Sequence, residues 1–288
     1  DSWQARVKNQ TPHCKFGEEG ICCRICTMGP CRITKKAPRG ICGCDVHGIV
    51  GRNYLKFTAG GAATHSDHGR EICHTLYEAS ADGCYKVKDP EKLIRIANEW
   101  GMETEGKDIY ELAHEVALEG LMEYGKPFGT QRFLKRAPES QQKLWEENEL
   151  APHAIDREVS RSLHMAHMGC SSKPEALVKQ SIRAGLSDGW GGSMMGTEFS
   201  DILFGTPKPI ETEANLGVMV EENVNIVVHG HDPSLSEMIC EVADSPEMIA
   251  YAKEQGAKGI TISGVCCTSN EVAMRRGIPM AGNFLQQE

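Results

Sequence analysis

Residues 11–50 read TPHCKFGEEGICCRICTMGPCRITKKAPRGICGCDVHGIV and contain seven of the 13 cysteines of the chain. The stretch is also rich in glycine and proline, and it shows no long hydrophobic period. This composition predicts loops and short helices whose shape is set by bound metal rather than by an apolar core. The rest of the chain is too long and too helical for a small disulfide scaffold, so we expect metal ligands rather than disulfides.

Three of these cysteines, Cys23, Cys26 and Cys31, have the spacing with which a short loop holds an iron–sulfur cubane. Either Cys42 or Cys44 can return as the fourth thiolate ligand. A zinc site, which four thiolates also suit, and a cysteine cluster without redox activity are the alternatives. The number of clustered thiols exceeds the need of one zinc ion, which favours iron and sulfur.

Two further cysteines, Cys14 and Cys22, are then left over, and two thiolates cannot complete a cubane by themselves. A two-fold axis would add two more from a second subunit, and homodimers are the commonest symmetric assembly. We therefore predict a cluster shared between two copies of the chain. The spacing favours [4Fe–4S], although two subunits could hold [2Fe–2S] equally well.

Composition and charge limit the functional class. The chain has 288 residues, enough for one large or two smaller domains, and its formal net charge of −9 disfavours a nucleic-acid binder. No apolar run is long enough for a membrane span or a secretory signal, so we expect a cytoplasmic protein. The first residue is not methionine, which suggests that further residues precede it.

Helical patterns fill the middle of the chain. Asp89-Pro90 predicts a helix start and Gly101 its end, while Asp108 begins a second helix that reaches Gly125. Further helical patterns cover 155–168 and 174–186. We predict a mostly α domain over residues 1–207 that carries the iron–sulfur loops.

The pattern changes after residue 207 to short apolar runs at 223–228 and 259–265, separated by helical segments. This β-α-β order predicts parallel strands at the start of a Rossmann-like α/β domain over residues 208–288. A third strand is expected at 280–284. Three strands are too few for such a domain, so we expect the natural chain to continue beyond residue 288.

His231 and Cys267 each follow directly after one of the two apolar runs. The carboxyl ends of parallel strands meet in one crevice, where an imidazole and a thiolate make a plausible metal pair. The alternative is that His231 caps the next helix and Cys267 is a small core residue. The residues alone do not separate the two interpretations.

His65, His68 and His74 are spaced by multiples of three on a predicted helix, so they follow one side of it. Imidazoles titrate near neutral pH and can pass protons along such a row. Chance spacing of surface histidines is the alternative, and spacing alone favours it.

The segments CKFG (14–17), GICCRIC (20–26), GPCRI (29–33) and GICG (40–43) together closely resemble the amino terminus of nickel–iron carbon monoxide dehydrogenases. The resemblance extends over nearly the whole chain, through residues 60–74, 201–207, 213–217, 229–233 and 264–272. It implies that Cys14 and Cys22 hold the shared cluster, and that Cys23, Cys26, Cys31 and Cys42 hold one [4Fe–4S] cluster per subunit. Cys44 is an extra thiol in this comparison.

The resemblance also implies that His231 and Cys267 bind the unique iron of a Ni–Fe–S centre, and that His65, His68 and His74 form a proton path. The other ligands of that centre lie downstream in the family. The resemblance does not match Cys73, Cys84, Cys170 or Cys240 to ligands of that centre. The complete centre therefore requires residues beyond this chain.

The expected activity is interconversion of CO and water with CO2, protons and electrons in a homodimer, with a ferredoxin-like electron carrier. A membrane hydrogenase or an acetyl-CoA-forming protein is a further partner that the resemblance suggests, and the former would bring the protein to a membrane. The alternatives are a hybrid-cluster protein, which is a hydroxylamine reductase of similar fold, and an iron–sulfur electron-transfer module without a catalytic centre.

Overall fold

The computed structural model describes residues 2–81, 83, 85–230 and 233–282, apart from the side chains of Pro233, Thr268 and Ser269. The chain is mostly helical, with a small parallel sheet, as predicted. It divides into two compact units, unit 1 with Asp1–Asp67 and Met122–Met194, and unit 2 with His68–Leu121 and Met195–Glu288. The domain boundary predicted near residue 207 stays a prediction.

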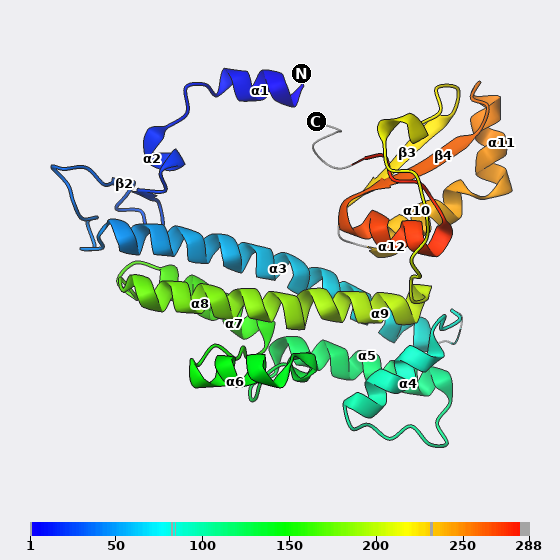
Figure 1. Ribbon diagram of the computed structural model, residues 1–288, viewed down its shortest axis with the longest axis horizontal. Helices are drawn as coiled ribbons and strands as arrows, with labels where there is room; N and C mark the ends of the chain where they lie inside the picture. The colour runs from blue at the N-terminus through cyan, green and yellow to red at the C-terminus, as the bar shows by residue number, and fades with distance from the viewer. Residues whose placement is uncertain (1, 82, 84, 231–232, 283–288) are drawn as a thin grey trace. The chain divides into compact units, whose positions relative to one another are not determined.

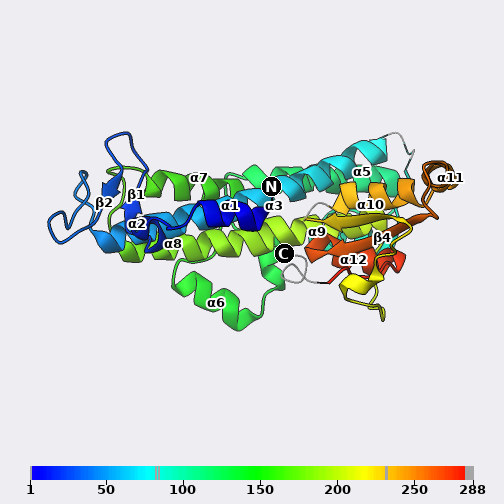
Figure 2. The same cartoon turned by 90° about the horizontal axis from the view of Figure 1, so that it is seen from above.

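Unit 1 contains the cysteine-rich segment and a group of helices. Helices α7 and α8 run alongside the amino-terminal part of α3, and Leu55, Ala166 and Leu177 form a buried cluster between them (Figures 1 and 2). Gly51 lets the helices approach closely, because a Cβ there would lie 3.3 Å from the Leu177 side chain. The elements of this unit are α1 (Trp3–Asn9), α2 (Lys15–Glu18), β1 (Cys22–Cys23), β2 (Cys31–Arg32), the first part of α3 (Val46–Ala81), the end of α5 (Ile109–Gly125), η1 (Arg132–Arg136), α6 (Glu139–Glu147), α7 (Ile155–Ala166), α8 (Pro174–Ser187) and the π-helix η2 (Asp188–Ser193).

Unit 2 joins further helices to a parallel sheet. The helix starts predicted at Asp89 and Asp108 are confirmed, because each carboxylate accepts a hydrogen bond from a first-turn N–H, that of Lys92 or Tyr110, at 2.9 Å. The elements are the rest of α3, α4 (Pro90–Glu99), most of α5, α9 (Met194–Phe204), η3 (Leu216–Val218), β3 (Val224–His229), α10 (Pro233–Ala243), α11 (Pro246–Glu254), β4 (Ile260–Val265) and α12 (Cys266–Arg276).

The two predicted strands are confirmed as a parallel pair, with Val224 opposite Ile260 and His229 opposite Val265. Helices α10 and α12 pack against each other and against β4 (Figure 1). Met280 forms parallel bridges to Gly264 and Ala214, at the start of the predicted third strand, and residues from 283 onward lie outside the described part. The sheet is small, and its assignment as Rossmann-like stays a prediction.

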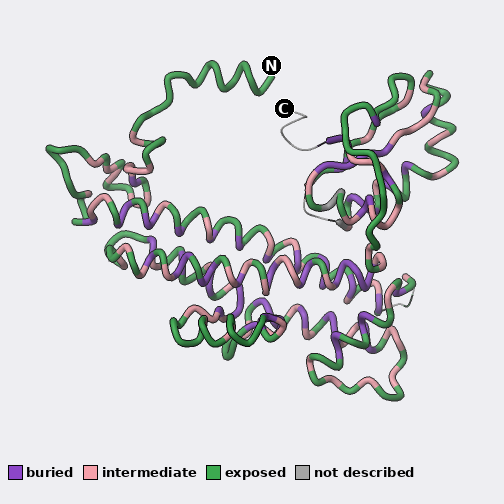
Figure 3. Tube along the Cα trace, in the orientation of Figure 1, coloured by how far each residue is buried: buried purple, intermediate pink, exposed green. Residues whose placement is uncertain are grey.

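Helix α1 and the long helices differ in burial. Helix α1 buries none of its residues, whereas purple buried positions recur along the long helices (Figure 3). Among the described residues, no helix has both the length and the apolar character that crossing a bilayer requires.

Candidate metal centre

The cysteine-rich segment is organised by a short antiparallel hairpin. β1 pairs with β2 so that Cys23 lies opposite Cys31 and Cys22 lies opposite Arg32. Neighbouring side chains of a strand point to opposite faces, so the Cys22 and Cys23 thiols diverge although the two residues are adjacent. The two thiols of this dipeptide are therefore available to different surroundings.

Five thiols line one cavity beside this hairpin, those of Cys23, Cys26, Cys31, Cys42 and Cys44. Four of these are the predicted ligands of a single cluster, and the structure brings them together. Ile25, Ile49 and Met168 complete the apolar part of the lining. Cys14 and Cys22 do not line this cavity.

The five thiols of the cavity are donors that suit an iron–sulfur cluster. In the part of the chain that the structure describes, no three His, Cys, Asp or Glu side chains are placed to hold one metal ion, as a zinc site requires. A cubane instead presents four irons, each of which takes its own thiolate, so its ligands surround a cavity. All 12 cysteines in the described ranges are free thiols.

Arg52 is a residue of this site that the sequence analysis missed. It lies on α3 with a relative exposure of 1 % and lines the thiol cavity. Its Nη1 donates to the Cys42 Sγ at 3.5 Å, its Nε donates to the Ser171 carbonyl at 2.9 Å, and its Nη2 donates to the same carbonyl. An arginine among small and apolar residues at the start of a helix is a weak signal, and only the fold reveals its partner.

Cys42 and Cys44, the two candidates for the fourth ligand, differ in their thiol pKa, and the hydrogen bond from Arg52 to Cys42 contributes to this difference. It lowers the pKa of Cys42, which favours the thiolate form that binds metal. Burial raises the pKa of Cys44, which favours the protonated thiol. Burial by itself would lower the pKa of Arg52, but the hydrogen bond to Cys42 and the neighbouring thiolates raise it.

The remaining two cysteines of the segment lie at its edge. Cys14 is exposed and is the residue before α2, and Cys22 is half-buried in β1. The side-chain amide of Asn53 donates to the Gly20 and Cys22 carbonyls, each at 3.0 Å, and so fixes this part of the segment to α3.

His65 is held by Asp188, a second residue that the sequence analysis missed. The His65 Nδ1 lies 2.6 Å from the Asp188 Oδ1, and this hydrogen bond raises the pKa of His65. Asp188 begins the π-helix η2, an irregularity that is frequent at functional sites. Gly192 of η2 allows the close approach, because a Cβ there would lie 2.9 Å from the Cβ of His65.

The other two predicted histidines have different surroundings in unit 2. His68 is half-buried, and its ring lies against Gly196 of α9, where a Cβ would be 3.6 Å from the His68 Cε1. His74 is exposed, and its Nε2 lies 3.8 Å from Glu78 Oε1. The row therefore lies on one helix, as predicted, and becomes more exposed toward its carboxyl end.

The structure describes one of the two predicted ligands at the ends of the parallel strands. Cys267 is exposed in the first turn of α12, and His231 lies outside the described residues. Cys266 before it adopts a left-handed φ of 67°, which is strained for a residue with a side chain. This turn connects β4 directly to α12.

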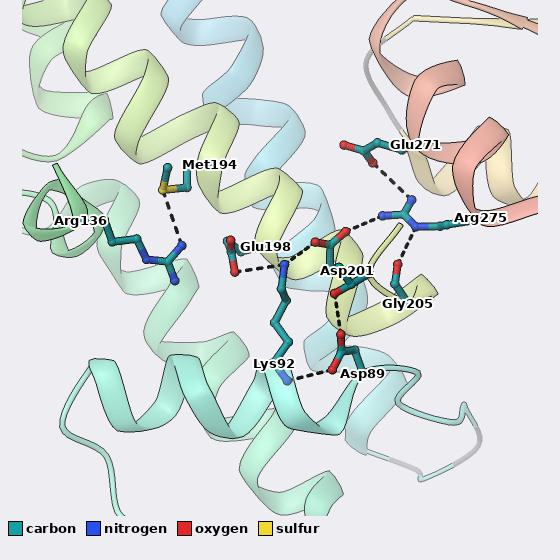
Figure 4. A network of polar contacts seen from close by, with 10 residues as sticks. Asp89, Lys92, Arg136, Met194, Glu198, Asp201, Gly205, Glu271 and Arg275 are labelled. Carbon is teal, nitrogen blue, oxygen red and sulfur yellow. Dashed lines mark hydrogen bonds and ion pairs between the residues drawn. The ribbon is translucent and has the colours of Figure 1, made fainter. Parts of the chain in front are cut away.

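A buried ion network fixes α12 within unit 2 (Figure 4). Arg275 of α12 contacts Asp201 of α9 at 2.7 Å and Glu237 of α10 at 3.3 Å. Asp201 also pairs with Lys92 of α4, and both carboxylate oxygens of Asp201 are thereby used. The network anchors the helix whose first turn contains Cys267.

Comparison with known proteins assigns the family. The model of the Prismane/CO dehydrogenase family matches residues 21–288. The chain belongs to this family. Carbon monoxide dehydrogenase 1 of Methanosarcina acetivorans is 48 % identical over 98 % of this chain and 46 % of its own length. Carbon monoxide dehydrogenase 1 of Carboxydothermus hydrogenoformans is 46 % identical over 98 % of this chain and 45 % of its own length.

Solved structures agree with this assignment. The Ni-free carbon monoxide dehydrogenase from Thermococcus sp. AM4 superposes with a TM-score of 0.93 at 48 % identity, over 100 % of this chain and 46 % of that one. An acetyl-CoA synthase/carbon monoxide dehydrogenase, described with nickel-containing [Fe4S4] clusters, superposes with a TM-score of 0.90 at 42 % identity. The match covers 100 % of this chain and 43 % of that one. The resemblance seen in the sequence is confirmed, and the chain spans about half the length of the curated relatives it matches.

Proposed function

We propose that this chain contributes to a carbon monoxide dehydrogenase, which interconverts CO and water with CO2, two protons and two electrons. The observation that carries the proposal is the cavity lined by five thiols, in a chain of the Prismane/CO dehydrogenase family. Such a cavity suits an enzyme that must store and pass on electrons.

The cluster of the cavity would be held by Cys23, Cys26, Cys31 and Cys42. Once bound, a [4Fe–4S] cluster supplies one-electron storage at a potential that the protein adjusts. The Arg52 hydrogen bond favours the Cys42 thiolate as fourth ligand, while Cys44 stays buried beside it. The structure thus supports the choice of Cys42 over Cys44 that the GICG match suggested.

A second cluster would be shared between two copies of the chain through Cys14 and Cys22. Neither lines the cavity, and Cys14 is exposed while Cys22 is half-buried. The neighbouring face of α3 carries Val50, Tyr54 and Phe57, and the last of these is 81 % exposed. An apolar stripe of this kind, one helical turn apart, supports a protein interface there.

The two ends of the parallel strands would supply His231 and Cys267 to a Ni–Fe–S centre. This proposal is supported by the register, which sets His229 opposite Val265 and so brings both carboxyl ends to one edge of the sheet. When bound, the nickel and iron would activate CO and water. The left-handed turn at Cys266 and the anchoring of α12 by Arg275 would hold the Cys267 thiol in place.

Protons would leave along His65, His68 and His74. Asp188 accepts the hydrogen bond of His65 Nδ1, and the His65 imidazole would carry the transferred proton. Asp188 also keeps the ring in one orientation, as a positioning residue. His65 and His68 are half-buried and His74 is exposed, which agrees with a path that ends in water.

Electrons would pass to a ferredoxin-like carrier, and a reducing cytoplasm would keep the thiols free for metal. A hydrogenase or an acetyl-CoA-forming protein is a further proposed partner. The proposal is supported by one relative, the carbon monoxide dehydrogenase/acetyl-CoA synthase subunit beta of Moorella thermoacetica.

The test is anaerobic purification followed by iron, nickel and sulfide analysis and a CO-oxidation assay with a viologen acceptor. We expect Cys26→Ser to lose the iron of one cluster, and Cys170→Ser, at an exposed cysteine outside the cavity, to keep it. Hydroxylamine reduction by a nickel-free protein would support the hybrid-cluster alternative. Clusters with neither activity would identify an electron-transfer module.

A further inference from the structure

Arg52 places a permanent positive charge beside the thiol cavity. A guanidinium stays protonated at any pH at which the protein is folded. With 1 % exposure, its charge is scarcely screened by solvent. In the described part of the chain no carboxylate pairs with Arg52, and its hydrogen bonds go to the Ser171 carbonyl and the Cys42 sulfur.

The geometry fixes which way this charge points. The Ser171 carbonyl accepts from both Nε and Nη2, so it holds one edge of the guanidinium plane. The other edge presents Nη1 to the Cys42 Sγ at 3.5 Å. A second N–H···S contact lies on the same cavity, where the Ile41 backbone N–H donates to Cys31 Sγ at 3.4 Å. Arg52 is the charged donor of the two.

A cluster becomes more negative by one charge when it takes up an electron. A positive charge and a hydrogen bond at one of its sulfur ligands therefore stabilise the reduced state more than the oxidised state, and this raises the reduction potential. The effect is large where the donor is buried and ionised, since the local dielectric is low.

We propose that Arg52 is a positioning residue that raises the reduction potential of the cluster held by Cys23, Cys26, Cys31 and Cys42, through its charged hydrogen bond to the Cys42 sulfur. The inference rests on the proposed function, because it requires that these thiols hold a cluster. Beyond that function, it assigns to Arg52 a role in setting the reduction potential of this cluster.

The experiment is a potentiometric titration of the purified holoenzyme, followed by EPR of the reduced clusters. The signal that Cys26→Ser abolishes identifies the cluster of the cavity. We compare wild type with Arg52→Gln, which removes the charge, and Arg52→Lys, which keeps the charge but loses the planar fork. Arg24→Gln is the matched control, because Arg24 lies between two of the same ligands but is exposed.

We expect Arg52→Gln to lower the reduced-to-oxidised ratio of this cluster at fixed potential by roughly tenfold or more, which corresponds to about 59 mV for one electron. Arg52→Lys should lie between Arg52→Gln and wild type, and Arg24→Gln should match wild type. The other EPR signals should keep their midpoints.

An unchanged midpoint in an iron-loaded Arg52→Gln variant would overturn the proposal. So would loss of the cluster from both Arg52 variants with retention in Arg24→Gln, since Arg52 would then be needed only for assembly. Absence of iron from the wild-type protein would instead contradict the proposed function itself, so the two failures are distinguishable.

Discussion

The cysteine-rich segment and the parallel β3–β4 sheet with its helices (the β3–β4 layer) are two candidate metal sites with different kinds of core. In the segment, half of the small apolar cluster consists of cysteines, namely Cys23, Cys31 and Cys44. The β3–β4 layer has a larger cluster of mainly aliphatic residues from both strands, α10 and α12. In the first region, residues of the apolar cluster are themselves candidate ligands, whereas in the second region Cys267 does not belong to the apolar cluster. The difference predicts that metal stabilises the first region far more than the second.

Removal of iron should have the largest effect and should be confined to the segment. In small metal-held folds the metal supplies on the order of 10 kcal/mol, so we expect amides of residues 14–45 to exchange roughly a hundredfold faster or more after chelation. The β3–β4 amides should keep their protection and serve as the internal control. Hydrogen exchange read by mass spectrometry measures both regions in one sample. An equal loss of hydrogen-exchange protection in residues 14–45 and in β3–β4 would contradict the prediction that metal stabilises the first region more than the second.

Asp201→Asn should have the next largest effect, and it should act on the second region. The Asp201 side chain is 4 % exposed and pairs with Lys92 and Arg275, so the substitution leaves two buried cations undercompensated. We expect a loss of about 3–5 kcal/mol in the free energy of unfolding, measured with urea. Glu222→Gln, at an exposed pair with Lys258, should change it by at most about 1 kcal/mol. Similar effects of both substitutions would contradict the anchoring role of the network.

The neighbouring thiols Cys42 and Cys44 should respond differently to substitution. Cys42→Ala should lose roughly the four irons of one cubane. Cys44→Ala should keep the iron and cost about 1–2 kcal/mol of stability, because Cys44 is a buried core residue with a raised pKa. Iron analysis and thermal unfolding measure the two quantities. Iron loss in Cys44→Ala alone would exchange the two roles.

Asp188→Asn should have the smallest effect on stability, and the effect should depend on pH. The pKa of His65 is raised in the folded state, so the pair stabilises the fold fully below the ordinary histidine pKa near 6.5. This contribution disappears as the pH rises through the raised value. The wild type should exceed Asp188→Asn by about 1 kcal/mol or less at pH 6, with a smaller difference at pH 9, as measured by thermal unfolding. Glu78→Gln, beside exposed His74, is the control. A difference that grew with pH would be inconsistent with this assignment.

Local signals in the sequence predicted the local elements. The cap at Asp89, the two parallel strands and the gathering of Cys23, Cys26, Cys31 and Cys42 around one cavity were all predicted. These depend on neighbouring residues, on short spacings or on strand order. The family was also recognisable, because its motifs lie in the same loops.

Contacts between distant residues could not be predicted in this way. Arg52 and Ser171 are 119 positions apart, and His65 and Asp188 are 123 apart, so no short pattern links them. The length of α3 was not predicted either, since the helix runs from Val46 to Ala81 through Gly60 and Gly61, two residues that disfavour a helix. The assignments of Cys14, Cys22, His231 and Cys267 as ligands and of His65, His68 and His74 as a proton path stay predictions.

If the chain forms the proposed homodimer, the hairpin that turns Cys22 and Cys23 to opposite faces has a consequence for electron transfer between the two subunits. If each thiolate ligates its own cluster, a single peptide link forms a covalent bridge between a cluster of one subunit and the cluster shared with its twin. The peptide backbone would then connect the clusters of the two subunits for electron transfer. Electrons produced in either half could leave from whichever side meets an acceptor first.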